Sequence, residues 1–147
     1  AKLGRATHAW RLCTLIEENT LAGIGAENAA RLYSSSGYFQ NINSPQAAAF
    51  SKRYYDKFGS DAPALNALGE SCYDGVYLFN ALANKAKSVS AEKIASTSEG
   101  ASFSSPRGNM TLAQGHVDKD IYLAEAVDGR FRVVETFENV PSGSTCS

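Results

Sequence analysis

Polar side chains suited to holding a small molecule follow two apolar runs in the N-terminal part of the chain. Thr14, Glu17 and Glu18 lie at or just after the end of the run Trp10–Ile16, and Tyr38 follows the next run. If both runs are strands of an open α/β sheet, their carboxyl ends lie at the edge where such folds bind ligands. Tyr38 offers an apolar ring and a hydroxyl, a combination that suits a small polar ligand.

Each of these candidates also has a purely structural interpretation, and both interpretations stay open. Tyr38 and Phe39 would cover the edge of the sheet. Glu17 and Glu18 would favour the N-terminus of a helix through its dipole. Glu70 is a further candidate ligand-binding residue near the start of a later helix, and the same dipole explanation applies to it.

The sequence lacks the residue sets that catalysis, metal binding or cofactor binding would need. The two histidines are isolated, and the spacing of the three cysteines, Cys13, Cys72 and Cys146, fits no zinc motif. Gly23-Ile24-Gly25 lacks the continuation of a dinucleotide fingerprint, and no serine lies in a nucleophile elbow. We therefore expect no catalytic residue, no metal site, no cofactor and no enzymatic activity.

Composition and charge narrow the class of partner. The chain has 147 residues, of which 44% are hydrophobic and 20% charged, as in one globular domain. Its net charge of −1 argues against nucleic acid as a partner, because phosphate binding needs an excess of Lys and Arg. No apolar run approaches the roughly 18 residues of a membrane span. The first residues include neither Met nor a signal-like apolar region, so we expect either a removed targeting segment or a start inside a longer protein.

Local patterns predict the elements that would position these side chains. Trp10–Ile16 suits a short buried strand, Leu21–Ala30 one or two helical turns, and Arg31–Phe39 a second strand. A helix is predicted between two clear end signals: Ser44 as its cap with Pro45 at the first helical position, and Gly59 at its C-terminal end. Its buried face would carry the four-residue repeat Phe50, Tyr54 and Phe58.

The second half of the chain predicts further helices and then strands. A helix from Asn66 to Ala86 would bury the helically spaced residues Leu68, Cys72, Tyr73, Val76, Phe79 and Leu82 or Ala83, with Gly75 marking a close backbone approach. A short helix follows from Ala91 to about Ser98, and then a turn-rich connector, Ser102–Arg107. Three strands are expected at Asn109–Leu112, Asp120–Ala126 and Arg130–Phe137, and Asp128-Gly129 predicts a hairpin between the last two. The order predicts a layered α/β fold with parallel strands, right-handed crossovers and a C-terminal antiparallel hairpin.

The chain resembles type I periplasmic solute-binding proteins of the amide, urea and branched-chain amino acid branch. The resemblance is carried by the order and spacing of five segments: Ala22–Ala30, Tyr38–Pro45, Gly69–Tyr73, Ser105–Gly108 and Ile121–Glu125. It implies two α/β lobes that close on a ligand, with residues 1–30 in the second lobe, 31–105 in the first and 106–140 a second-lobe hairpin. The Ser- and Gly-rich residues 141–147 are expected to be a disordered tail. It also places Tyr38 at a cleft position that packs on the ligand.

The resemblance implies a ligand class as well. Amino-acid binders of the family pair a carboxylate after the earlier strand with the ligand ammonium. Here that place falls near Thr14 or Leu15, and Glu17 and Glu18 come slightly later. This departure leaves room for a neutral amide or urea, which needs hydrogen bonds but no counter-charge.

The function implied is binding of a short amide, urea or amino acid as the substrate-binding component of an ABC transporter. The partners would be that small molecule and a transporter permease, and the location would be extracytoplasmic, either periplasmic or lipid-anchored. One alternative is a cytoplasmic amide sensor of the same fold, and another is a truncated interaction module without ligand binding. Family members are much longer, so we expect the chain to be the C-terminal part and unstable alone unless it forms a homodimer or meets the missing N-terminal part. Light scattering that shows a stable monomer would contradict that expectation.

Overall fold

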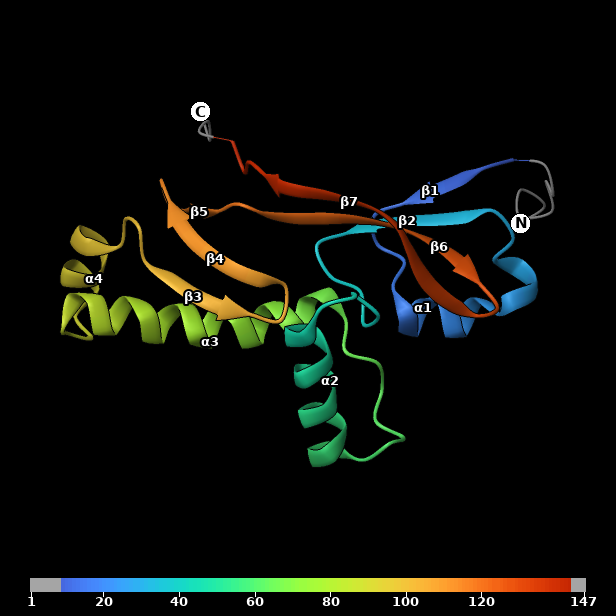
Figure 1. Cartoon of the computed structure of the whole chain (residues 1–147), viewed down its shortest axis with the longest axis horizontal. Helices are drawn as coiled ribbons and strands as arrows, with labels where there is room; N and C mark the ends of the chain where they lie inside the picture. Colours follow the sequence, from blue (N-terminus) through green and yellow to red (C-terminus); the bar gives the residue numbers. More distant parts are fainter. Residues whose placement is uncertain (1–8, 144–147) are drawn as a thin grey trace.

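The computed structural model describes residues 9–143 and arranges their strands in two sheets (Figure 1). The larger sheet has the order β1-β2-β6-β7. Its strands β1 (Arg11–Cys13) and β2 (Leu32–Ser36) are parallel, and the chain between them forms α1 (Glu18–Ile24) and a 3-10 turn, η2 (Ala26–Asn28). The predicted parallel pair, joined by helical turns, is therefore confirmed.

The C-terminal hairpin completes the larger sheet. Strand β6 (Lys119–Val127) is antiparallel to both β2 and β7 (Arg130–Val140). The turn residues Asp128 and Gly129 have φ of 50° and 75°. A two-residue hairpin turn that matches the twist of its strands needs left-handed φ at both positions, which explains the strong Asp-Gly preference. The predicted hairpin is confirmed.

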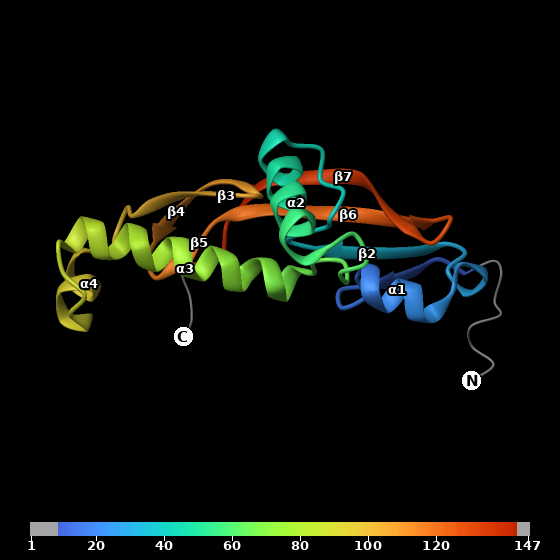
Figure 2. The same cartoon turned by 90° about the horizontal axis from the view of Figure 1, so that it is seen from below.

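The smaller sheet consists of the antiparallel strands β3 (Ser102–Ser105), β4 (Gly108–Ala113) and β5 (His116–Val117). Helix α3 (Ala67–Ala86) runs along this sheet, and the short helix α4 (Ala91–Thr97) lies at its far end (Figures 1 and 2). The connector predicted at Ser102–Arg107 is wrong in part. Its serines pair with β4 as a strand, and only Pro106 and Arg107 form the turn.

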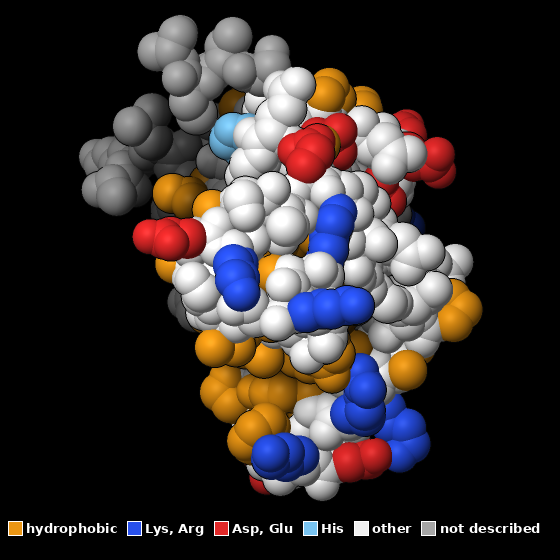
Figure 3. Space-filling model, turned by 90° about the vertical axis from the view of Figure 1, so that its left-hand side faces the viewer, with side chains coloured by type: hydrophobic (Ala, Val, Ile, Leu, Met, Phe, Trp, Pro, Cys, Tyr) orange, Lys and Arg blue, Asp and Glu red, His pale blue; other side chains and the backbone are white. Residues whose placement is uncertain are grey.

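Helix α2 (Pro45–Phe58) has the predicted ends. Ser44 Oγ accepts a hydrogen bond from Ala47 N at 3.0 Å, and Gly59 closes the helix at φ 90°. The predicted buried face holds only at the first turns: Phe50 is buried, Tyr54 is half-buried and Phe58 is 61% exposed. Figure 3 shows hydrophobic side chains gathered on the part of the molecule that α2 occupies, below several Lys and Arg side chains.

The main core lies against one face of the larger sheet, where Figure 2 shows α1, and it extends to Ala47 and Phe50 of α2. Leu21 of α1 is fully buried there, and the rings of Phe39 and Phe131 meet at 5.1 Å. The prediction that Trp10–Ile16 forms a buried strand is wrong. β1 has only three residues at the sheet edge, so Trp10 and Leu12 are 69% and 68% exposed.

Helix α3 has the predicted span but not the predicted orientation. Leu68, Val76 and Phe79 are exposed, and so is Cys72, whereas Glu70 and Asp74 are buried. Of the other residues predicted to be buried, Tyr73, Leu82 and Ala83 are half-buried. Two carboxylates face inward because Arg107, in the turn between β3 and β4, pairs with them. The close backbone approach expected at Gly75 is also wrong for residues 9–143, since a side-chain carbon placed there would meet nothing within 4 Å.

Parts of the terminal predictions cannot be compared with the structure. Residues 1–8 and 144–147, which include Cys146 and most of the predicted tail, lie outside the described residues, while residues 141–143 carry no regular secondary structure. Cys13 and Cys72 are free thiols. None of the helices in the described part of the chain is long and apolar enough to span a membrane.

Candidate ligand-binding site

A hollow of about 470 Å³ opens where β1 and β2 end. Thr14, Leu15 and Glu17 line it from the loop after β1, and Ser36 and Gly37 line it from the end of β2. Because the two strands are parallel, their carboxyl ends open at the same edge of the sheet. We call this cavity the strand-end hollow. Its remaining lining residues are Thr20, Asn66, Ala67, Leu68, Ser71, Arg107 and Lys119.

The first turn of α3 forms one wall of the strand-end hollow. Asn66 caps the helix, because its Oδ1 accepts a hydrogen bond from Gly69 N at 2.8 Å. Glu17 Oε2 accepts a second bond from Ala67 N at 3.1 Å. Glu17 and Glu18 lie at the N-terminus of α1, as predicted, but the side chain of Glu17 bonds the N-terminus of α3.

Glu18 and Tyr38 lie deeper than the surface of the hollow. Glu18 Oε1 accepts a hydrogen bond from Gln40 N at 2.7 Å, whereas its buried Oε2 has no partner among the described residues. Burial raises the pKa of the Glu18 carboxyl. Tyr38 is 1% exposed, and its buried hydroxyl also lacks a described partner. Burial, with the nearby Glu70, raises the pKa of the Tyr38 phenol.

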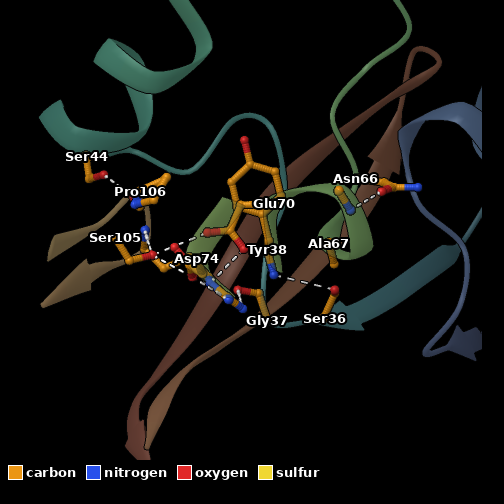
Figure 4. A network of polar contacts seen from close by, with 12 residues as sticks. Ser36, Gly37, Tyr38, Ser44, Asn66, Ala67, Glu70, Asp74, Ser105 and Pro106 are labelled. Carbon is orange, nitrogen blue, oxygen red and sulfur yellow. Dashed lines mark hydrogen bonds and ion pairs between the residues drawn. The ribbon is translucent and has the colours of Figure 1, made fainter. Parts of the chain in front are cut away.

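A buried polar network lies beside Tyr38 and joins α3 to the β3–β4 turn (Figure 4). Arg107 Nη2 donates to Asp74 Oδ2 at 2.7 Å, and Arg107 Nε lies 2.9 Å from Glu70 Oε2. The second contact is a close ion pair whose N–H is not aligned on the oxygen. Ser105 Oγ donates to Asp74 Oδ2 at 2.9 Å and accepts from Arg107 N at 3.1 Å. We call Glu70, Asp74, Ser105 and Arg107 the buried network.

Two carboxylates, those of Glu70 and Asp74, share the guanidinium of Arg107 in the buried network. Burial and then Asp74 raise the pKa of Glu70 to about 8, against the opposing effect of Arg107. In Figure 4 the Tyr38 hydroxyl points away from these carboxylates.

Lys119 enters the strand-end hollow from the start of β6. A side-chain carbon built on Gly37 would lie 3.3 Å from both Lys119 Cε and Nζ, so the amine lies over the backbone of Gly37. Burial lowers the pKa of the Lys119 ammonium, and the neighbouring Arg107 adds to this effect.

A second and larger hollow, of about 940 Å³, lies against the C-terminal hairpin. Asn41–Ser44 line one side of it, and Tyr122, Phe131 and other residues of β6 and β7 line the other. We favour the strand-end hollow as the ligand site because it lies at the carboxyl ends of the parallel strands and receives a half-buried cation.

The structure brings two of the five predicted site residues to the strand-end hollow. Thr14 and Glu17 line it. Glu18, Tyr38 and Glu70 belong to the buried surroundings, and a ligand contact by them stays a prediction. The sequence reasoning missed Ser36, Arg107 and Lys119. The segment Ser105–Gly108 carried part of the family resemblance, which was the available signal for Arg107. None of the His, Cys, Asp and Glu side chains within residues 9–143 form a group of three that could hold a metal ion.

Comparisons with known proteins agree with this architecture. Residues 3–130 match the family model described as periplasmic binding protein. A solute-binding protein of an ABC transporter from Rhodopseudomonas palustris HaA2, solved with p-hydroxybenzoic acid, is 25% identical with a TM-score of 0.78, over 93% of this chain and 39% of that one. A leucine-, isoleucine-, valine-, threonine- and alanine-binding protein from Brucella ovis is 21% identical with a TM-score of 0.73, over 95% of this chain and 40% of that one.

A curated protein named limonene hydroxylase, from Geobacillus stearothermophilus, is 26% identical over 117 residues. The match covers 78% of this chain but only 21% of that protein. The chain thus spans well under half the length of each of these proteins.

Proposed function

This chain belongs to the periplasmic binding protein family, and from that premise we propose that it binds a small polar solute in the strand-end hollow. The observation that carries the proposal is the position of this hollow at the carboxyl ends of β1 and β2. Open α/β sheets bind their ligands there because polar loop groups and helix N-termini converge at that edge. Its volume of about 470 Å³ suits a small molecule.

The proposed role is that of the solute-binding component of an ABC transporter. The Rhodopseudomonas palustris and Brucella ovis proteins, described as binding an aromatic acid and amino acids, support a small ligand. The partner would be a transporter permease, and the site of action would be extracytoplasmic. The amide and urea expected from the sequence remain candidate ligands beside amino acids and aromatic acids.

We further propose that the two sheets belong to two lobes. One lobe would hold β1, α1, β2 and the hairpin β6–β7, and the other would hold α2, α3, α4 and β3–β5. Helix α2 is assigned with α3 because the rings of Phe50 and Tyr73 meet at 4.6 Å. Since β2 pairs with β1 and β6, the proposed first boundary moves from residue 31 to about Gly37.

The test is ligand titration of the ¹⁵N-labelled chain, with acetamide, urea, leucine and 4-hydroxybenzoate in separate experiments. At least one ligand should shift the amide signals of Thr14–Glu17, Ser36–Gly37 and Ala67–Ser71. Thr14→Ala should weaken that binding, because it removes a lining hydroxyl, whereas Thr111→Ala, at an exposed position on β4, should not. Shifts confined to the larger hollow around Asn41–Ser44, or no shifts with any ligand, would contradict the proposal.

A further inference from the structure

Lys119 places a half-buried positive charge in the strand-end hollow. Its amine makes no ion pair or hydrogen bond with any of residues 9–143. Exposed lysines extend their amines into water, whereas this amine lies over Gly37 and burial lowers its pKa. A cation in such a place is most stable when a bound anion completes its surroundings.

The acidic side chains around Lys119 are engaged elsewhere. Asp74 and Glu70 both pair with Arg107, and neither carboxylate lies within ion-pair distance of the Lys119 amine. Glu17 lies in the hollow but accepts a hydrogen bond from Ala67 N at the start of α3.

The sequence neighbours of Lys119 are also occupied. Asp118 accepts hydrogen bonds from Ser142, and Asp120 accepts one from Asn139 N at 2.9 Å. Neither aspartate lies within ion-pair distance of the Lys119 amine. With Glu138, they line a separate small cavity of about 190 Å³ that Lys119 also borders.

Neutral hydrogen-bonding groups complete the surroundings of the amine. Thr14, Ser36 and Ser71 line the same hollow as Lys119. Gly37 provides the space, because a side chain there would press on the lysine. One ammonium among several hydroxyls matches the needs of a carboxylate, whose oxygens accept charge-assisted and neutral hydrogen bonds together.

We propose that Lys119 binds a carboxylate group of the solute, so that the ligand is an organic acid or amino acid rather than a neutral amide or urea. This inference rests on the proposed function and specifies its ligand class. Arg107 is not the anion receptor, because the buried network and the carbonyl of Gly37 occupy its guanidinium.

The experiment compares carboxylic acids with their own primary amides, which have the same size and shape. Leucine and leucinamide, and benzoate and benzamide, are titrated into the 147-residue chain by NMR. The acid of at least one pair should bind about tenfold or more tightly than its amide, the factor expected for one charged hydrogen bond. Lys119→Met should reduce the affinity for the acid by about that factor and reduce the affinity for the amide by less, because the amide carries no charge. Lys119→Arg should retain most of the preference for the acid.

Lys57→Met is the matched control, since Lys57 is exposed on α2 and lies outside the strand-end hollow. Equal binding of acid and amide by the unaltered chain would overturn the inference while the proposed function stands. An equal loss for both members of a pair in Lys119→Met would overturn it as well. If no probe binds, both the inference and the proposed function fail. The comparison in the unaltered chain decides the matter even if the variants do not fold.

Discussion

Replacing Arg107 with alanine would leave a carboxylate in the interior without its counter-charge. The Arg107 and Asp74 side chains are only 5% and 7% exposed, and Nη2 lies 2.7 Å from Oδ2. Removing one partner of such a buried pair costs about 3–5 kcal/mol, because the remaining charge stays out of water. The whole free energy of unfolding of a small domain is about 5–15 kcal/mol, so Arg107→Ala should remove a large share of it.

The assay is urea unfolding of the chain at neutral pH, followed by circular dichroism. Arg132→Ala provides a matched control: Arg132 also pairs with a carboxylate, that of Glu125 at 3.0 Å, but its side chain is 67% exposed. An exposed pair contributes about 0–1 kcal/mol. Arg132→Ala should thus lower the free energy of unfolding only slightly, whereas Arg107→Ala should lower it strongly.

A second substitution tests the cause of the loss. Adding Asp74→Asn to Arg107→Ala removes the orphaned charge, so the double variant should be more stable than the single one. An Arg107→Ala effect within about 1 kcal/mol of that of Arg132→Ala would refute the buried-charge reasoning. So would a double variant less stable than Arg107→Ala. If Arg107→Ala is unfolded in buffer, recovery of the helical signal in the double variant gives the same answer.

Three further predictions concern pH and the backbone. Because the pKa of Glu70 is raised from 4.5 to about 8, the folded chain retains a proton that the unfolded chain releases. The free energy of unfolding should therefore fall as pH rises from 4.5 to about 8. Glu70→Gln should make that decline smaller. Urea unfolding at several pH values that gives the same decline in the variant would contradict the prediction. Gly75→Ala should stabilise α3 by about 0.5–1 kcal/mol. Gly129→Ala should destabilise the folded chain by about 1–2 kcal/mol, because Gly129 has a left-handed φ of 75°. Thermal melts in which both variants shift the melting temperature in the same direction would contradict this prediction. Ser44→Ala should cost about 1 kcal/mol through loss of the α2 cap, while Ser90→Ala, at an N-cap without a side-chain bond, should cost almost nothing in the same melts.

Local signals in the sequence were sufficient where the cause of the structure is local. Ser44, Pro45 and Gly59 delimit α2 through their own backbone preferences, and Asp128-Gly129 makes its turn in the same way. Such features need no knowledge of distant partners. They were predicted with nearly the correct bounds.

The errors occur where a distant partner decides the outcome. Helical periodicity correctly identified an apolar side of α3, but it does not reveal which side of the helix packs against the rest of the chain. Arg107, 33 residues from Asp74, brings the carboxylate side inward. Lys119 was missed as a site residue for a similar reason, because only the pairing of β6 with β2 brings it to Gly37.

The orientation of α3 has a consequence for variation in the 147-residue chain. Tolerance to substitution usually falls as the hydrophobicity of the native residue rises. Along this helix the relation should be inverted: Val76 and Phe79 would accept lysine or glutamate and gain solubility, while Glu70 and Asp74 would reject leucine. A method that predicts tolerance from the hydrophobicity of the native residue would therefore rank the exposed apolar positions of α3 as sensitive and its two buried carboxylates as tolerant, which is the reverse of what we expect.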